Sequence, residues 1–434
     1  MKYTTIIGLE VHIEPNTKSK MFCSCPQNHF VAKPNSQTCP ICLGLLGSLP
    51  IANKEAINKT IKLGLALGSE ISKTSRFYRK HYFYPDLAKS FQTSQKDDPF
   101  CVGGSLLGKK INHIHLEEDA GKLIHETING EKVSLVDFNR CGCALIELVT
   151  EPVFHSTSEV LAFTKELQLI ARYLDISGAD MEKGTMRLEA NISLFLLGSE
   201  PATLPNYKVE LKNINSFRFL EKAINAEIKR QSECLDKGEK LIQETRGYDE
   251  HTKTTFSQRS KENSHDYRYF PEADLPPIVV SEYQVSSIKK SITELPQQKR
   301  ERFEKEYILS KDYIEILISD LSRANYFEVA SKLAPNLTKT IANAMINQNL
   351  DKNFEEPAGL VKKLIELTKT DFSPASDVEQ GIREVLSENP DVVTSYKNGK
   401  GQVVGFLIGQ VQKKLSGNGD PKLISSKLLE SLHG

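Results

Sequence analysis

The sequence lacks several features that would point to particular classes of protein. Its 434 residues carry no net charge, because 56 Lys and Arg side chains balance 56 Asp and Glu side chains. This balance argues against a protein that binds nucleic acid mainly through its overall charge, although a neutral protein can carry a local basic patch. No apolar run reaches the roughly 18 residues of a membrane span, and the N-terminal MKYTTIIGLEVHIE has no secretory layout. We therefore expect a cytoplasmic protein without a membrane-spanning helix.

A phosphate-binding P-loop is also absent. Residues 103–110, GGSLLGKK, approximate the Walker A pattern, but Lys110 stands where Ser or Thr must contact Mg²⁺. The flanking residues favour a turn between two strands rather than a strand followed by a helix. Any nucleotide bound by this chain must therefore occupy a different kind of site.

The chain changes texture along its length. Residues 1 to about 285 show strand-like alternation interrupted by Gly, Pro and Asn turns, and long amphipathic helical patterns begin near Ser286. A Pro/Ser break at residues 371–374 precedes a second helical block. A chain of this length holds two or three domains, and we place the boundaries near 290 and 370.

Four of the eight cysteines form two close pairs. Cys23 and Cys25 are separated by thirteen residues from Cys39 and Cys42. In a reducing compartment such pairs indicate metal ligands before disulfides. Four thiolates leave no open position on a zinc ion, so the spacing predicts a structural zinc site, with four incidental thiols as the alternative. The remaining thiols are expected in the core: Cys101, Cys141, Cys143 and Cys234.

Three strand-like segments carry polar side chains at every second position. In GLEVHIE, Glu10, His12 and Glu14 share one face and the aliphatic residues share the other. Two later segments place further polar groups on common faces: Arg187, Glu189 and Asn191, and then Lys208, Glu210 and Lys212. Taken singly, each segment is typical of a half-exposed strand with a solvated face.

Two carboxylates stand among apolar neighbours. Glu147 lies within the apolar run ALIELVTEP, and Glu118 shares a strand face with aliphatic residues of IHLEEDAGK. A buried carboxylate is costly unless it is paired or bound to metal. Oxygen ligands from several strands suit Mg²⁺, but buried salt bridges with Lys183, Arg187 or Lys212 would explain the same residues. The residues alone leave both interpretations open.

Two loop-like segments interleave aromatic and basic residues. They are FYRKHYFYPDLAKSFQTSQ, residues 77–95, and SKENSHDYRYFPEADLPP, residues 260–277. Such segments can stack on bases or on an aminoacyl end while Arg or Lys contacts phosphate. Aromatic core corners with surface charges are the alternative.

Ten ordered blocks resemble one known family, the B subunit of bacterial and organellar tRNA-dependent amidotransferases. They are GLEVHIEPNTKSKMF, CPICLGLLGSLP, RKHYFYPDLAKSFQTSQ, IHLEEDAGKL, SLVDFNRCG, LIELVTEP, ADMEKGTMRLEANIS, VELKNINSFR, QETRGYDE and HDYRYFPEADLPP. The C-terminal GFLIGQVQKKLSGNGDPKLISSKLL resembles the family's tail domain. The resemblance covers essentially the whole chain.

The resemblance implies an α+β fold in three domains. A glutamine-synthetase-like antiparallel β-sheet cradle would span residues 1–289, an all-α helical domain 290–369, and a small helical tail domain that binds tRNA 370–434. The implied activity is ATP-dependent phosphorylation of the side-chain carboxylate of Glu-tRNA(Gln), Asp-tRNA(Asn) or both, followed by amidation with ammonia. An amidase A subunit would supply the ammonia from glutamine, and a small C subunit would complete the heterotrimer.

The resemblance also implies roles for individual residues. Glu10, His12, Glu118 and Glu147 would form the catalytic site and hold Mg²⁺. Contacts to the ATP phosphates are assigned from strand faces to Lys183, Arg187, Lys208 and Lys212. Arg268 and Tyr269 would line the acceptor-end cleft, and Cys23, Cys25, Cys39 and Cys42 match the zinc-bearing members.

The chain departs from the family's usual pattern at Cys141, Cys143, Val153 and Glu189. Glu189 stands where Asp is usual, which keeps the charge but extends the side chain by about 1.5 Å. One alternative is a tRNA-binding scaffold subunit whose metal site has decayed. A second, the archaeal E-type relative, would carry an inserted domain for which the sequence leaves no room.

Overall fold

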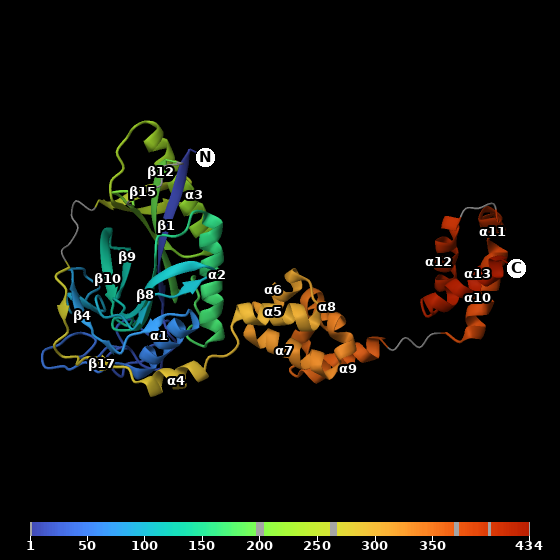
Figure 1. Ribbon diagram of the computed structural model, residues 1–434, viewed down its shortest axis with the longest axis horizontal. Helices are drawn as coiled ribbons and strands as arrows, with labels where there is room; N and C mark the ends of the chain where they lie inside the picture. The colour runs from blue at the N-terminus through green and yellow to red at the C-terminus, as the bar shows by residue number, and fades with distance from the viewer. Residues whose placement is uncertain (1, 197–203, 261–266, 369–372, 398–400, 434) are drawn as a thin grey trace. The chain divides into compact units, whose positions relative to one another are not determined.

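The computed structural model describes residues 2–196, 204–260, 267–368, 373–397 and 401–433. The chain divides into two compact units, residues 1–308 with 318–321, and residues 309–317 with 322–434. The first unit is mixed α/β with a large sheet, and the second consists of helical segments, as Figure 1 shows. The expected boundary near 370 falls at residues 369–372, which lie outside the described residues.

A ten-stranded sheet forms the centre of the first unit. Its strands are β1 (Tyr3–Ile13), β2 (Glu70–Ile71), β6 (Cys101–Val102), β7 (Ser105–Leu106), β8 (Lys109–Glu118), β11 (Ala144–Thr150), β12 (Met186–Leu196), β13 (Val209–Ile214), β14 (Glu244–Asp249) and β15 (Thr254–Ser260). Their order is β15-β14-β13-β12-β1-β11-β8-β6-β2, with β7 paired to β8. The pairing is antiparallel throughout, as expected, except between β13 and β14, which run parallel.

The long strand β1 holds the middle of this sheet. It pairs over its whole length with β12, so that Glu10 lies opposite Glu189 and His12 opposite Arg187. On its other edge it pairs with β11, which places Glu147 opposite His12. Its aliphatic residues are buried in the core: Leu9, Val11 and Ile13. The alternation expected for this segment is confirmed, and it assigns the polar residues to the opposite face of the sheet.

Long helices cover the apolar face of the sheet, although the sequence analysis expected mainly strands here. They are α1 (Lys54–Ala66), α2 (Thr157–Tyr173) and α3 (Phe217–Asp236). Ser156 and Ser216 cap the first turns of α2 and α3 by accepting hydrogen bonds from backbone amides. Figure 1 shows α2 and α3 side by side along one side of the sheet. Their apolar stripes join the sheet's core through Phe163, Leu167 and Leu220.

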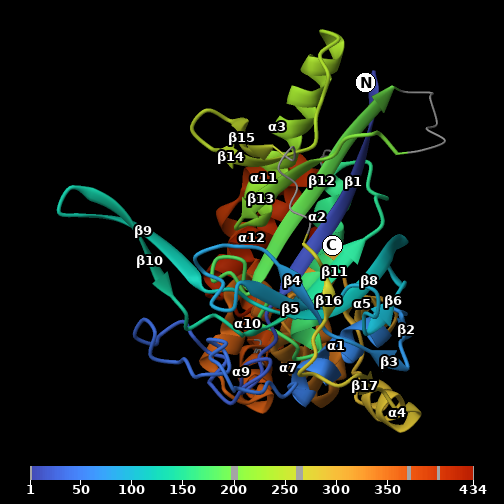
Figure 2. The ribbon, with the colours of Figure 1, turned by 90° about the vertical axis from the view of Figure 1, so that its left-hand side faces the viewer.

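Shorter elements surround the sheet. Three small sheets are β9 (Lys122–Ile128) with β10 (Glu131–Asp137); β4 (Tyr78–His81) with β5 (Phe91–Ser94) and β16 (Phe270–Pro271); and β3 (Thr74–Ser75) with β17 (Ile278–Val279). The β9–β10 hairpin extends beyond the rest of the first unit (Figure 2). The Walker-like residues 103–110 form the β7–β8 hairpin, which confirms the predicted turn between strands.

The helical part of the chain begins at α4, within the first unit. Its helices are α4 (Glu282–Lys290) and α5 (Pro296–Tyr307), followed by α6 (Lys311–Ile318), α7 (Leu321–Leu333), α8 (Thr338–Gln348) and α9 (Pro357–Thr368), and then by α10 (Ala375–Glu388), α11 (Pro390–Lys397), α12 (Val404–Lys414) and α13 (Pro421–His433). The last four helices enclose a core of their own that includes Ile382, Leu407 and Leu428. None of the helices in the described ranges is long and apolar enough to cross a membrane.

We expect the contact between α2 and the sheet to carry much of the first unit's stability. Phe163 of α2 is fully buried and packs edge-on against Phe154 at a ring separation of 5.1 Å. Phe163→Ala should lower the free energy of unfolding by roughly 3–5 kcal/mol, because the cavity cannot close completely. Phe83, which is 85% exposed, offers the control. Phe83→Ala should change stability by no more than about 0.5 kcal/mol in urea unfolding followed by circular dichroism.

Candidate functional site

The polar face of β1 carries a cluster of histidines and glutamates. Nε2 of His12 lies 3.4 Å from Oε2 of Glu147 and 3.5 Å from Oε1 of Glu117. Nε2 of His115 lies 3.2 Å from the same Glu147 oxygen. The strands β1, β11 and β8 bring these groups together, since Glu147 lies opposite both His12 and His115. We refer to His12, His115, Glu117 and Glu147 as the His–Glu cluster.

The charges of this cluster depend on one another. Burial alone would lower the pKa of His12, but the negative charges of Glu147 and Glu117 outweigh it and raise this pKa to about 9. Burial would raise the pKa of Glu147, but His115 and His12 hold it well below its usual value. Burial and the charge of Glu147 raise the pKa of Glu117. The protonation of each of these three groups therefore depends on its charged neighbours in the cluster.

A second cluster lies beside the first on the same face. Carboxylate oxygens of Glu10, Glu189 and Glu210 lie within 4.8 Å of one another, and we call these residues the acidic triad. Nδ2 of Asn191 donates to Oε1 of Glu10 at 2.9 Å. Nζ of Lys212 donates to Oε2 of Glu189 at 2.7 Å. Burial, together with Glu147 and the other two triad carboxylates, raises the pKa of Glu10.

The structure does not place Glu118 with His12 and Glu147. Glu118 instead pairs with Nζ of Lys89 and accepts a hydrogen bond from the backbone amide of Thr93 at 2.9 Å. Side chains alternate along β8, so Glu117 shares the face of His115 while Glu118 points to the other side. Glu10 is also separate, because it joins the acidic triad. The four predicted magnesium ligands thus belong to three different sites.

The four predicted phosphate contacts are also dispersed. Lys183 has a side chain that is 70% exposed and pairs with Asp180 at 3.6 Å. Arg187 is paired with Asp119 at 2.8 Å, and Lys212 with the acidic triad. Lys208 is exposed and lines a pocket together with Glu10, Asn191 and Tyr207. Only Lys208 and Lys212 therefore lie beside the acidic triad.

The two aromatic and basic segments lie side by side. Strand β16 pairs with β4, and the backbone amide of His81 donates to the carbonyl of Tyr267 at 2.8 Å. Burial raises the pKa of Tyr269, the charge of Lys80 opposes this, and the charges of Glu117 and Glu147 in the His–Glu cluster add to it. Arg268 is exposed, and its carbonyl lies 3.1 Å from Nδ1 of His81. Residues 261–266 of the second segment lie outside the described residues.

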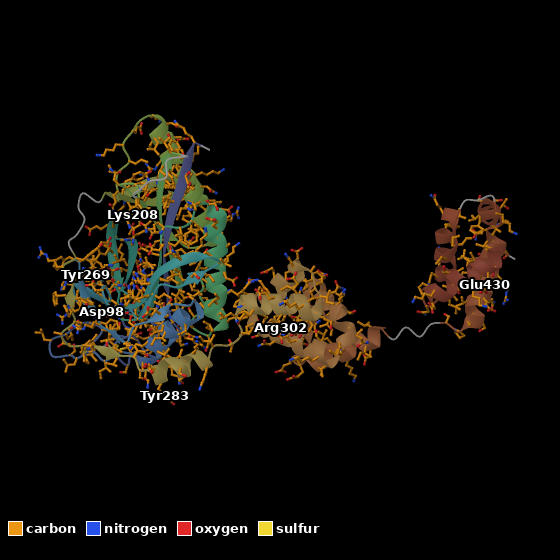
Figure 3. All side chains as sticks on the ribbon, viewed as in Figure 1. Asp98, Lys208, Tyr269, Tyr283, Arg302 and Glu430 are labelled. Atoms are coloured by element: carbon orange, nitrogen blue, oxygen red, sulfur yellow. The ribbon has the colours of Figure 1, made fainter. Side chains whose placement is uncertain are left out.

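Figure 3 shows that Lys208 and Tyr269 lie at separate places on the first unit. Lys208 lines the pocket beside Glu10, whereas Tyr269 directly precedes β16, the strand that pairs with β4. The predicted phosphate contact Lys208 and the predicted acceptor-end contact Tyr269 therefore lie apart on the first unit.

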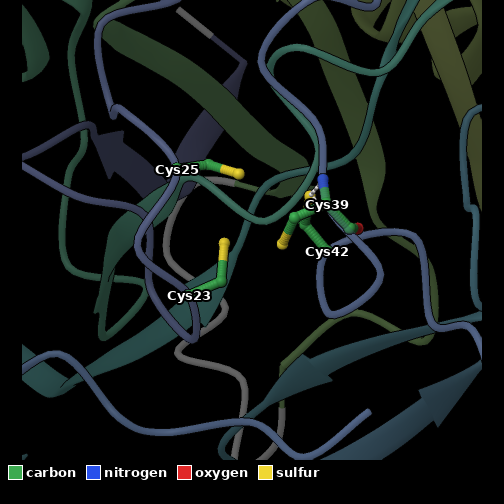
Figure 4. Close-up of side chains that lie close together, drawn as sticks. All are labelled: Cys23, Cys25, Cys39 and Cys42. Carbon is green, nitrogen blue, oxygen red and sulfur yellow. Dashed lines mark hydrogen bonds between the residues drawn. The ribbon is translucent and has the colours of Figure 1, made fainter. Parts of the chain in front are cut away.

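The sulfurs of Cys23, Cys25, Cys39 and Cys42 converge. Their four Sγ atoms all lie within 4.8 Å of one another. Figure 4 shows the thiols directed toward a common space. All four are free of disulfides. The backbone amide of Cys39 donates to Sγ of Cys42 at 3.1 Å. The neighbouring thiol of Cys23 lowers the pKa of Cys42 to about 5, against the effect of burial.

A fully buried lysine anchors this cysteine loop. Nζ of Lys20 donates to the carbonyls of Gln37 and Cys141 at 2.8 Å each and lies 3.8 Å from Sγ of Cys42. Gly142 allows the close approach, because its φ is +80° and a Cβ there would lie 3.0 Å from the Cβ of Cys42. The loop is therefore fastened to the turn that precedes β11. Cys141 and Cys143 in this turn are buried, as is Cys101, but Cys234 is only half-buried, so three of the four expected core thiols are confirmed.

The donor atoms of these clusters fit the metals that the resemblance implies. The acidic triad offers carboxylate oxygens from three strands, which Mg²⁺ prefers. In the described chain, Nδ1 of His12, Nδ1 of His115 and Oδ1 of Asn191 are buried without a hydrogen-bond partner. Such atoms are rare in folded proteins, and they point to a bound ligand or water at this face. Four converging thiols fit zinc in a closed tetrahedral site.

Sequence reasoning missed His115, Glu117 and Lys80. The signal for the first two was the alternating His-Leu-Glu of β8, which places both groups on one face once Glu147 is paired with His115. Lys80 lies within the aromatic segment. Only the fold shows that the charges of Glu117, Tyr269 and Glu147 raise its pKa, against the effect of burial.

Comparison with known proteins assigns the chain to a family. The family described as "GatB/GatE catalytic domain" matches residues 5–286, and "GatB domain" matches residues 308–432. The relatives from Brachyspira hyodysenteriae and Thermodesulfovibrio yellowstonii are 42% and 43% identical, and each alignment covers the full length of both chains. Each is named as the B subunit of an aspartyl/glutamyl-tRNA(Asn/Gln) amidotransferase. The chain belongs to the GatB family.

The GatB match extends over both compact units. A third relative of the same name, from Clostridium beijerinckii, is 42% identical over 99% of this chain and the whole of its own length. The family resemblance on which the sequence analysis relied is therefore confirmed. The relatives that match over both units carry the name of the B subunit of an aspartyl/glutamyl-tRNA(Asn/Gln) amidotransferase.

The ion pair beside the His–Glu cluster generates a pH prediction. Burial would raise the pKa of Asp119, but Arg187 and Arg140 outweigh it and lower this pKa from 3.8 to about 2. The pair therefore stabilises the fold fully above pH 3.8, and this contribution is lost as the pH falls through about 2. Asp119→Asn should cost on the order of 2 kcal/mol at pH 7.

Urea unfolding of both proteins at a series of pH values measures this effect. The difference in stability between wild type and Asp119→Asn should be constant at neutral pH and narrow as the pH drops below about 4. A difference that stays constant or widens in acid would contradict the assignment of the low pKa to Asp119.

Proposed function

We propose that this chain phosphorylates the side-chain carboxylate of Glu-tRNA(Gln), Asp-tRNA(Asn) or both with ATP, and then amidates it with ammonia. One observation carries the proposal: the acidic triad and the His–Glu cluster lie next to each other on one face of the sheet, joined by Glu10 and His12 of β1. Transfer of a phosphoryl group needs alignment and neutralisation of charge more than acid or base catalysis. Adjacent oxygen-rich clusters meet this need.

The nucleotide would occupy the pocket at the outer end of the acidic triad. The pocket is lined by Glu10, Asn191, Tyr207 and Lys208, and Oδ1 of Asn191 has no partner in the described chain. The ammonium of Lys208 would bind phosphate oxygens, and Lys212 would hold Glu189 and Glu210 in place. Arg187, already paired with Asp119, would act as a positioning residue for the His–Glu cluster.

Two bonds are exchanged in each step of this reaction. A carboxylate oxygen of the aminoacyl group forms a bond to the γ-phosphorus of ATP while the bond to ADP breaks. Ammonia then forms a bond to the acyl carbon, inorganic phosphate leaves, and the nitrogen loses a proton. Mg²⁺ held by the triad and by His12 and Glu147 would neutralise phosphate oxygens during transfer. The chain's own carboxylates would orient the reacting groups and exclude bulk water.

The same proposal covers the partners and the domain layout. An amidase A subunit would release ammonia from glutamine, and a small C subunit would complete a cytoplasmic heterotrimer. We propose a cradle of glutamine-synthetase type at residues 1–289, a helical domain at 290–369 and a tRNA-binding tail domain at 370–434. The separate hydrophobic core of the last four helices supports an independent tail. Arg268 and Tyr269 would line the cleft for the acceptor end.

Single-turnover transfer of labelled γ-phosphate to Glu-tRNA(Gln) or Asp-tRNA(Asn) by the reconstituted complex tests the reaction. Glu147→Gln should reduce the rate of transfer by roughly 10²- to 10³-fold, because a preorganised charge at the reacting phosphate is lost. Glu166→Gln is the control, since Glu166 is buried and paired with Arg300 away from both clusters. It should leave the rate unchanged.

Three outcomes of this experiment have different meanings. Loss of transfer in Glu147→Gln alone supports the proposal. Equal rates in wild type and Glu147→Gln would remove the His–Glu cluster from the reaction. Tight tRNA binding with no phosphoryl transfer at all would favour the alternative, a scaffold subunit without catalysis.

The zinc assignment generates a separate prediction. Zinc held by Cys23, Cys25, Cys39 and Cys42 would fasten the loop between the two cysteine pairs and take no part in the chemistry. Cys39→Ser should lose this zinc and make residues 26–38 more sensitive to proteolysis. Cys234→Ser, at a half-buried thiol outside the cluster, should do neither. Metal analysis and limited proteolysis provide the measurement, and unchanged zinc in Cys39→Ser would contradict the assignment.

A further inference from the structure

A third group of metal-binding side chains follows along the same face of β1. Glu14 comes directly after β1 and continues the alternation of Glu10 and His12. One ligand atom each from Glu14, His29 and Cys143 lies within 4.8 Å of the other two. The phosphoryl-transfer proposal uses none of these three residues, and the cysteine loop's own cluster does not include them.

The three residues come from separate segments, and backbone hydrogen bonds hold two of them. The amide of Glu14 donates to the carbonyl of Thr185 at 2.9 Å, and that of Cys143 to the carbonyl of Arg140 at 3.0 Å. Cys143 directly precedes β11, and His29 lies in the loop that follows Cys25. Glu14 and Cys143 are therefore held by the backbone of the sheet and of the turn before β11.

The side chain of Gln27 fixes the spacing within this group. Its Nε2 donates to Oε1 of Glu14 at 3.3 Å and to the carbonyl of Ala144 at 3.2 Å, and its Oε1 accepts from the amide of Ala144 at 3.0 Å. Gln27 occupies Oε1 of Glu14, so Oε2 of that carboxylate faces His29. A site whose parts are already in place loses little entropy when it binds a ligand.

The distance between His29 and Glu14 suits two neighbouring ligands of a tetrahedral ion. Nε2 of His29 lies 3.3 Å from Oε2 of Glu14. Bonds of about 2.0–2.3 Å to zinc correspond to about 3.3–3.7 Å between neighbouring ligands of a tetrahedron. The thiol of Cys143 makes only long contacts, at 3.5 Å to the carbonyl of Gln27 and 3.9 Å to that of Asn139. Its sulfur can therefore turn toward an ion without breaking a strong hydrogen bond.

Two further features bear on this group, a surface pocket at Glu14 and an aromatic ring against His29. A surface pocket lined by Glu14, Gln27, Asn28 and Phe30 lets water reach the carboxylate of Glu14. The ring of Phe30 lies against His29 at 4.2 Å between centroids and restrains the imidazole. The group thus offers three ligands from the chain, one fewer than the closed site of the four cysteines.

We propose that Glu14, His29 and Cys143 form a second transition-metal site, with water as the fourth ligand. A carboxylate, an imidazole and a thiolate together favour a borderline divalent ion, and zinc is the most suitable candidate. Two anionic ligands balance the charge of the ion, so the buried site is neutral when it is filled. The ion would fasten the end of β1 to the start of β11, beside the cysteine loop.

Metal analysis of the full-length chain, dialysed against metal-free buffer after zinc loading, tests the proposal. We expect two zinc ions per chain in the wild type and one in both Cys143→Val and His29→Gln. Cys39→Ser should also retain one, and Cys39→Ser combined with Cys143→Val should retain none. Cys101→Ala is the matched control, since Cys101 is a buried thiol outside every cluster, and it should retain two.

Cobalt substitution gives a second measurement that does not depend on stoichiometry. Co²⁺ added to metal-free Cys39→Ser should produce a thiolate-to-metal absorption band, and the double variant should show none. Circular dichroism and urea unfolding of each variant establish that it is folded.

The results separate this site from the proposed zinc of the cysteine loop. One zinc that is lost in Cys143→Val and kept in Cys39→Ser supports the present site and removes the other. One zinc that is lost in Cys39→Ser and kept in Cys143→Val overturns the present site, and so does a second zinc that survives both Cys143→Val and His29→Gln. A wild type without zinc overturns both. None of these results depends on the phosphoryl-transfer proposal.

Discussion

The alternation of side chains along β1 is the constraint on which the rest of the first unit depends. Leu9, Val11 and Ile13 must stay in the core, and a shift of one residue would exchange them with Glu10 and His12. Pairing along both edges, with β12 and β11, makes that shift costly. The same pairing places polar residues of neighbouring strands opposite one another, so the burial of one face builds the sites on the other.

The sequence was informative where a pattern is local. Period-two alternation predicted which side chains of β1 share a face, and the spacing of Cys23, Cys25, Cys39 and Cys42 predicted that they converge. It was insufficient where the answer depends on pairing between strands. Glu118 and Glu117 are adjacent in the chain, and only the register of β8 against β11 decides that Glu117 faces His115 and Glu147. The helices α2 and α3 were missed because alternation in the neighbouring strands dominated the interpretation of residues 1–285.

Lys20 illustrates a second limit of local patterns. In the sequence it is one of several lysines near the cysteines, and a lysine is seldom fully buried without a partner. In the structure it is fully buried, and its ammonium contacts the carbonyls of Gln37 and of the distant Cys141 and lies near the thiol of Cys42. Such a position can be recognised only when the turn at Gly142 has been brought against Cys42. The residue that fastens the cysteine loop to the sheet is therefore visible only in the fold.

The polar face of the sheet gathers several carboxylates close together. In the acidic triad, the ammonium of Lys212 pairs with Glu189 and Glu210, and burial with like charges raises the pKa of Glu10. In the His–Glu cluster, burial and the charge of Glu147 raise the pKa of Glu117 as well. Carboxylates held this close repel one another when they are poorly solvated. The ionisation of each one therefore lowers the free energy of unfolding. A bound cation would remove that repulsion, so the face is better suited to the ligand-bound state than to the empty one. The strand pairing that buries the core holds these groups together despite their repulsion, and this links the stability of the apolar face to the reactivity of the polar one.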